Sequence, residues 1–97
     1  MARYKVILAY DGTEFSGFQR QAGGRTVQDV VEEALRRIGW QDRVILAAGR
    51  TDTGVHARGQ VIAFDLDWHH SPADLQRAIN ANLPADVAAR EVHQADA

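Results

Sequence analysis

Two amphipathic helical segments, each with its own start signal, constrain the fold of this chain more than any other feature. The first is expected to begin after Thr26, whose hydroxyl can cap a helix, and to end at Gly39, which suits a left-handed C-terminal cap. Its apolar residues recur with the spacing of one helical face, at Val27, Val30, Val31, Ala34, Leu35 and Ile38. Gln28 and Glu32 are among the residues that we expect on the opposite, polar face.

The second helical segment is expected to begin at Ser71 and to end before Pro84. Ser71 can cap the helix, and Pro72 fits the first helical position, where no backbone hydrogen bond is lost. The apolar stripe of this segment consists of Leu75, Ala78, Ile79 and Leu83.

Stretches rich in β-branched and aromatic residues flank both helices and predict four strands. We expect these strands at residues 4–10, 44–48, 61–66 and 87–93, with a compact loop over residues 50–59. The resulting order is strand, helix, strand, strand, helix, strand. That order is typical of the ferredoxin-like or RRM-like α+β fold, in which two helices cover one face of a four-stranded antiparallel sheet.

Composition limits both the domain organisation and the classes of function. The 97 residues are expected to form a single domain, and the absence of cysteine excludes disulfides and thiolate metal sites. No apolar run reaches the roughly 18 residues of a membrane helix, and the N-terminus lacks a signal-peptide layout, so we expect a cytoplasmic domain without membrane contact. The net charge of −2 argues mildly against a nucleic-acid partner. However, ten of the 11 basic residues are arginines, which favour bidentate contacts to phosphate.

The segment most informative about chemistry is GRTDTGVHA at residues 49–57, between the second and third predicted strands. Asp52 would be held between two strands, a fixed position that suits a nucleophile or a base. Arg50 can bind a phosphate beside that carboxylate and help to keep it ionised. The same pattern is also typical of an ordinary Asp turn or of a solvated surface ion pair, so spacing alone leaves the role of Asp52 open.

The segment at residues 49–57 resembles the catalytic-loop signature of the tRNA pseudouridine synthase A family. Two further segments are similar to that family in the same order, YDGTEFSGFQRQ at residues 10–21 and INANLP at residues 79–84. The resemblance implies that uridine is isomerised in the anticodon arm of tRNA by a homodimer that needs no metal or redox cofactor. Members of the family are longer and contain a second α/β half, so the resemblance implies that this chain is the N-terminal half.

The resemblance also assigns roles to particular residues. Asp52 would be the catalytic carboxylate, which attacks the sugar, attacks the ring or removes a proton. The residues expected to contact RNA are Arg50, His56, Arg58, Arg20, Arg25 and Phe18. Phe18 stands where the family usually has tryptophan, and both Phe18 and Phe15 could stack on a base or pack on the core.

Three alternatives remain at this point. A non-catalytic RNA-binding module of the RRM type shares the predicted element order, but residues 58–65 lack the aromatic residues of its third strand. A dimeric aspartic protease could use a single Asp-Thr-Gly, but two capped helices argue against that mostly β fold. The chain could also be an interaction half that pairs through its sheet.

Overall fold

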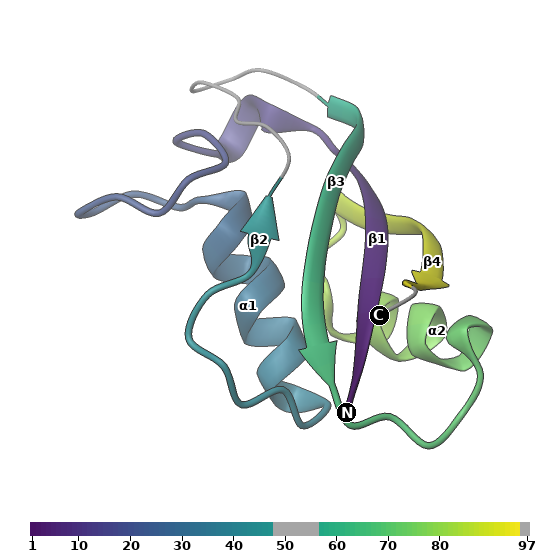
Figure 1. Ribbon diagram of the computed structural model, residues 1–97. Helices are drawn as coiled ribbons and strands as arrows, with labels where there is room; N and C mark the ends of the chain where they lie inside the picture. The colour runs from purple at the N-terminus through teal and green to yellow at the C-terminus, as the bar shows by residue number, and fades with distance from the viewer. Residues whose placement is uncertain (48–56, 96–97) are drawn as a thin grey trace.

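The sheet of the computed structural model has four antiparallel strands, and both helices lie on one of its faces (Figure 1). The structure describes residues 1–47 and 57–95, with backbone only at positions 57 and 58. The strands are β1 (Ala2–Tyr10), β2 (Leu46–Ala47), β3 (Ala57–Leu66) and β4 (Val87–Gln94). The helices are α1 (Val27–Arg37), α2 (Pro72–Asn82) and a short 3₁₀ helix, η1 (Gly12–Glu14). The strand order β2-β3-β1-β4 confirms the predicted ferredoxin-like α+β fold.

Local sequence signals account for both helix starts and for the end of α1. The Thr26 hydroxyl accepts a hydrogen bond from the Asp29 amide at 3.2 Å, and Ser71 does the same for Asp74 at 3.1 Å. Gly39 follows α1 with a φ of 106°, a conformation that side chains with a Cβ rarely adopt. These caps confirm the predicted helix starts and the predicted role of Gly39.

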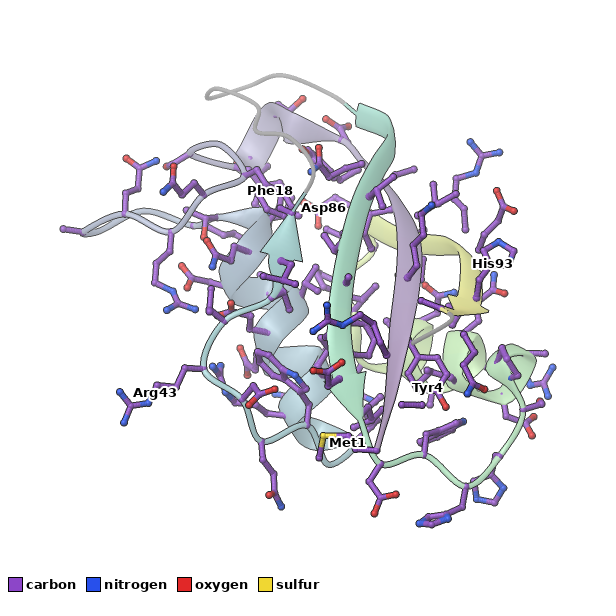
Figure 2. All side chains as sticks on the ribbon, in the orientation of Figure 1. Met1, Tyr4, Phe18, Arg43, Asp86 and His93 are labelled. Atoms are coloured by element: carbon purple, nitrogen blue, oxygen red, sulfur yellow. The ribbon has the colours of Figure 1, made fainter. Side chains whose placement is uncertain are left out.

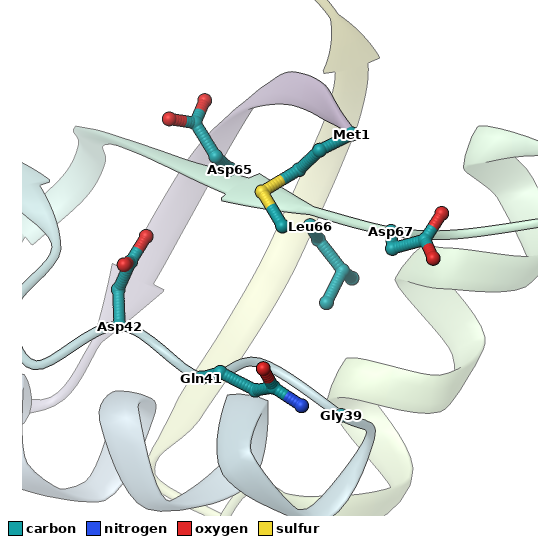
Figure 3. Close-up of a pocket in the computed structure, with 7 residues that line it drawn as sticks. All are labelled: Met1, Gly39, Gln41, Asp42, Asp65, Leu66 and Asp67. Carbon is teal, nitrogen blue, oxygen red and sulfur yellow. The ribbon is translucent and has the colours of Figure 1, made fainter.

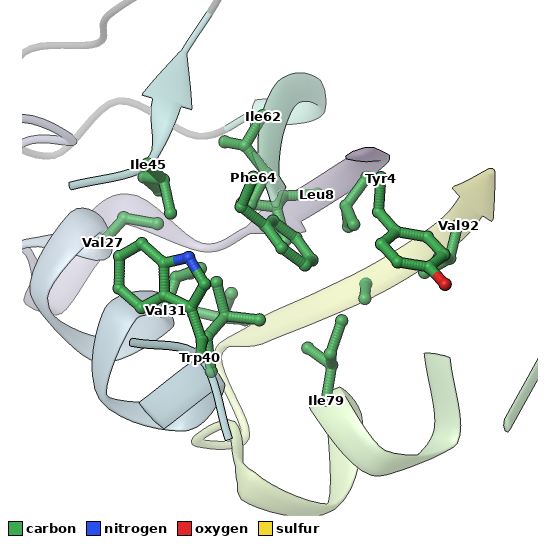
Figure 4. Packing of buried hydrophobic residues seen from close by; sticks show 14 of the residues in the cluster. Tyr4, Leu8, Val27, Val31, Trp40, Ile45, Ile62, Phe64, Ile79 and Val92 are labelled. Carbon is green, nitrogen blue, oxygen red and sulfur yellow. The ribbon is translucent and has the colours of Figure 1, made fainter. Parts of the chain in front are cut away.

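The core lies between the sheet and the two helices (Figure 4). Alternate residues of β1 point into it, namely Tyr4, Val6, Leu8 and Tyr10. Leu35 of α1 and Leu75 of α2 are fully buried against them. Trp40 is also buried, and Trp68 packs partly against the cluster. Among the described residues, neither α-helix is long and apolar enough to cross a membrane.

The second and third strands differ from the prediction. β3 begins at Ala57 rather than at residue 61, because Tyr10 and Leu8 of the long central strand β1 pair with Ala57 and Gln60. The loop predicted over residues 50–59 therefore extends too far, because residues 57–59 belong to β3. β2 begins at Leu46 rather than at Val44, since Leu46 and Ala47 are the described residues of this stretch that pair with β3.

Candidate functional site

Segments that are distant in the sequence meet at the end of the sheet where β1 finishes and β3 begins (Figure 1). Tyr10 of β1 pairs with Ala57, the last residue of the GRTDTGVHA motif. The Asp11 amide donates to the carbonyl oxygen of Asp86 at 3.0 Å, which brings the turn before β4 to the same end. Figure 2 shows Phe18 and Asp86 there, whereas Met1 lies at the opposite end. The fold thus brings together the start of the segment at residues 10–21, the last residue of the motif and the turn that follows the segment at residues 79–84.

Most of the motif itself lies outside the described residues. This applies to the predicted catalytic residue Asp52 and to the predicted RNA contacts Arg50 and His56. Arg58 belongs to β3 by its backbone, and its side chain is not among those described. The roles of these residues therefore stay predictions.

Arg20 forms ion pairs with two acidic side chains of α1. Its Nε lies 2.8 Å from Oδ1 of Asp29, and its Nη2 forms an ion pair with Oε1 of Glu32. The Arg20 side chain is nevertheless 45% exposed. The guanidinium group thus combines an internal structural role with a surface that remains accessible to solvent.

Arg25 joins the loop after β1 to the turn before β4. Its Nη1 and Nη2 donate to the two carboxylate oxygens of Asp86 at 2.7 and 3.0 Å, and its Cζ lies 4.1 Å from the centre of the Phe15 ring. These hydrogen bonds lower the pKa of the Asp86 carboxyl, although its partial burial opposes this effect. The planar guanidinium can therefore make a bidentate ion pair and a cation–π contact at once.

We expect Asp86→Asn to change how the free energy of unfolding depends on pH in the acidic range. A carboxylate whose pKa is lowered by folding stabilises the folded state above its unfolded pKa of about 3.9, and this contribution disappears as the pH falls through the folded-state pKa. Because the Arg25 side chain is 39% exposed, solvent screening should limit the contribution to about 0.5–1 kcal/mol. Urea unfolding at a series of pH values from about 7 to about 2 should show the difference in free energy of unfolding between wild type and variant vanishing in acid. An equal difference at every pH would contradict this account.

The aromatic side chains of the loop after β1 are buried. Phe15 and Phe18 are each 2% exposed, and both rings pack against Tyr10, with centroid distances of 6.4 and 6.2 Å. This arrangement favours the packing alternative over base stacking for both rings.

Two residues of α1 are buried that the sequence analysis placed on the polar face. Gln28 is 8% exposed and Glu32 is 0% exposed, whereas Val30 and Ile38 of the predicted apolar stripe are only partly buried. The buried face of the helix is therefore rotated toward Gln28 and Glu32. The sequence did contain one signal of this burial, because Gln28 and Glu32 are four residues apart and lie beside the apolar stripe. A prediction from polarity alone, however, places both side chains in solvent.

Two hollows occupy opposite ends of the sheet. The first, of about 170 Å³, is lined by Phe18, Gln19, Gln28, Val44, Ile45 and Ala47, next to the segment that enters the motif. The second, of about 250 Å³, contains Asp42, Asp65 and Asp67 (Figure 3). Asp65 is engaged there by Arg3, whose hydrogen bonds lower the pKa of the Asp65 carboxyl. No three His, Asp or Glu residues of the described ranges are arranged to hold a metal ion.

The sheet face opposite the helices counts against the RRM alternative. Phe64 of β3 is 3% exposed and points into the core. The neighbouring positions Val61, Ala63 and Asp65, which alternate with the core residues of that strand, carry no aromatic ring. The described part of β3 thus lacks the aromatic platform on which an RRM stacks bases.

Comparison with known proteins gives one consistent result. A family model described as tRNA pseudouridine synthase matches residues 6–97. The chain is similar to proteins named tRNA pseudouridine synthase A from Pseudothermotoga lettingae, at 49% identity over 96 residues, and from Geobacillus kaustophilus, at 53% over 96 residues. These matches cover 99% and 98% of this chain but 39% and 37% of the two relatives, so the chain spans about two fifths of their length. Because the family match covers nearly the whole chain, the chain belongs to the tRNA pseudouridine synthase family.

Proposed function

We propose that this chain is the N-terminal, catalytic-loop-bearing part of an enzyme that converts uridine to pseudouridine in the anticodon arm of tRNA. The observation that carries the proposal is the family match over residues 6–97, a range that includes the motif at residues 49–57. The relatives named tRNA pseudouridine synthase A support it, with about half of their aligned residues identical to this chain.

The proposed reaction is an isomerisation. The bond from the ribose C1′ to N1 of uracil breaks, the base turns, and C1′ forms a new bond to C5. C5 loses a proton and N1 gains one, so no oxidant or reductant is consumed. The target nucleotide must leave the base stack before a side chain can reach these atoms.

In this proposal, Asp52 is the catalytic carboxylate. Attack on the sugar, attack on the ring and removal of a proton are the three roles that such a group can play. Arg50 would hold a phosphate or fill the space left by the extruded base, and His56 and Arg58 would contact RNA nearby. These four residues lie within the nine positions from residue 50 to residue 58, which supports a common site.

Arg20 and Arg25 are proposed as contacts to the RNA backbone. Their side chains are 45% and 39% exposed, so each can meet a phosphate while it keeps its carboxylate partners. Phe18 is better explained as a packing residue, because its ring is buried against Tyr10.

The proposal extends to the organisation of the protein. Residues 1–97 would form one domain of a longer cytoplasmic enzyme that acts as a homodimer on tRNA and needs no metal or other cofactor. Light scattering of the natural full-length protein tests the oligomeric state, and a monomer would contradict that part of the proposal.

The direct test of function uses the natural full-length protein and tRNA transcribed without modified bases. We expect pseudouridine to form in the anticodon arm, as detected by mass spectrometry of nuclease fragments. Binding to tRNA without conversion would favour the RNA-binding module instead, and conversion confined to another arm would overturn the proposed substrate position.

A further inference from the structure

The carboxylate of Glu32 lies at the centre of a buried polar network. Its side chain is fully buried, and Oε2 accepts hydrogen bonds from Nε2 of Gln28 at 3.0 Å and from the amide of Ile45 at 3.1 Å. Oε1 forms ion pairs with Arg20 and, at 3.7 Å, with Nη2 of Arg36. A buried acid of this kind is tolerated only because it is both hydrogen-bonded and paired with charge.

One side of the network holds the chain that leads into the motif. Among the described residues, Leu46 and Ala47 are the part of this segment that pairs with β3, so strand pairing does not hold the residues just before Leu46. α1 adds two contacts from side chains one helical turn apart. Glu32 accepts from the Ile45 amide, and Nη2 of Arg36 donates to the Arg43 carbonyl at 3.1 Å. The backbone just before β2 is therefore fixed to the helix by both an acceptor and a donor.

The other side of the network holds the loop after β1. The Arg20 amide donates to Oε1 of Gln28 at 2.7 Å, and the Gln28 amide donates to the Phe18 carbonyl at 2.9 Å. The Arg20 guanidinium returns to Glu32 itself. Through Gln28, the same carboxylate thus connects the loop that carries Phe18 with the segment that carries Ile45.

We propose that Glu32 is a positioning residue, which sets the separation between the loop at residues 18–20 and the segment that enters the motif. This inference rests on the proposed function, because its consequence is the placement of Asp52 relative to the bound nucleotide. The hollow of about 170 Å³ lies between the two segments that Glu32 connects, with Phe18 and Gln19 on one and Val44, Ile45 and Ala47 on the other. Small displacements of a catalytic group are costly, since about 1 Å can reduce a rate on the order of a hundredfold.

Glu32→Gln in the natural full-length protein tests this role. The glutamine keeps the volume and one acceptor oxygen but turns an amide group toward Arg20 and Arg36. We expect kcat per folded molecule to fall at least about tenfold while KM for tRNA changes by less than about threefold, since binding groups are retained. Amide hydrogen exchange at Ile45 should become faster. The control is Glu33→Gln, which removes an exposed acid that pairs with Arg37 one turn away and should leave both readouts unchanged.

Arg36→Met provides a second variant, because the Arg36 side chain is 47% exposed and its loss leaves the buried carboxylate with its other partners. Arg36→Met should also lower kcat, but by a smaller factor than Glu32→Gln. If Glu32→Gln does not fold at the assay temperature, the kcat of Arg36→Met tests the positioning role instead. Unchanged kcat in the folded variants, or unchanged exchange at Ile45 in Glu32→Gln, would overturn the positioning role. If wild type itself forms no pseudouridine, the proposed function fails, and exchange at Ile45 alone then decides whether Glu32 holds this segment.

Discussion

Asp52→Asn is expected to abolish pseudouridine formation while tRNA binding persists. Asparagine has nearly the same size as aspartate, but it cannot ionise, so it serves neither as a nucleophile nor as a general base. Loss of such a group should reduce the single-turnover rate by at least about a thousandfold. The rate should be measured with the natural full-length protein in excess over an unmodified tRNA, and binding should be measured separately by filter retention.

Asp42→Asn is the matched control for this variant. Asp42 lines the hollow at the opposite end of the sheet from the motif, and its replacement removes the same charge from the same protein (Figure 3). The control should retain wild-type turnover. If Asp52→Asn also retains it, Asp52 has no part in the mechanism and the assignment taken from the motif is wrong.

Leu35→Ala is expected to have the largest effect on stability. Leu35 is 0% exposed in the core between α1 and the sheet, so truncation loses its burial and leaves a cavity. The expected cost is about 3 kcal/mol in the free energy of unfolding. For a domain of this size, that cost corresponds to a fall of roughly 15 °C in the melting temperature. Thermal and urea unfolding followed by circular dichroism measure both quantities.

Leu46→Ala makes the same substitution at a residue of β2 that is 53% exposed. Its effect should stay within about 0.5 kcal/mol, because little burial is lost. Equal destabilisation by the two variants would mean that the core does not lie where the structure places it.

The helices could be predicted because their signals are local. Thr26 and Ser71 cap the backbone a few residues away, and Gly39 adopts the positive φ that ends α1. Each signal depends on neighbours in the sequence, so no knowledge of the tertiary structure is needed. With both helices placed, the order of the remaining β-rich stretches was enough to predict the fold.

The strand ends could not be predicted in the same way. β3 starts at Ala57 because Tyr10 of β1, far away in the sequence, lies opposite it. Residues 57–60 have no apolar alternation of their own that would indicate a strand, so their conformation depends on the pairing. β2 likewise begins at Leu46, two residues later than predicted, because Leu46 is the first described residue of this stretch that pairs with β3.

The buried network around Glu32 was missed for a related reason. A glutamate on a helix is normally expected to face solvent, and the polarity of Gln28 and Glu32 supported that interpretation. The partners that make burial acceptable are Arg20 and the amide of Ile45, both from other segments of the chain. The chemistry assigned to Asp52, by contrast, comes from the motif and its family resemblance, since spacing alone also fits a simple turn.

The central claim is that the Asp52 carboxylate meets a uridine that has left the base stack. A crystal structure of the natural full-length protein bound to its tRNA tests this most directly. We expect the target uridine to be extruded toward the end of the sheet where β1 meets β3, with a carboxylate oxygen of Asp52 within about 3.5 Å of the ribose or the base. A uridine that stays stacked in the RNA, or a carboxylate that faces the packed interior, would contradict the account.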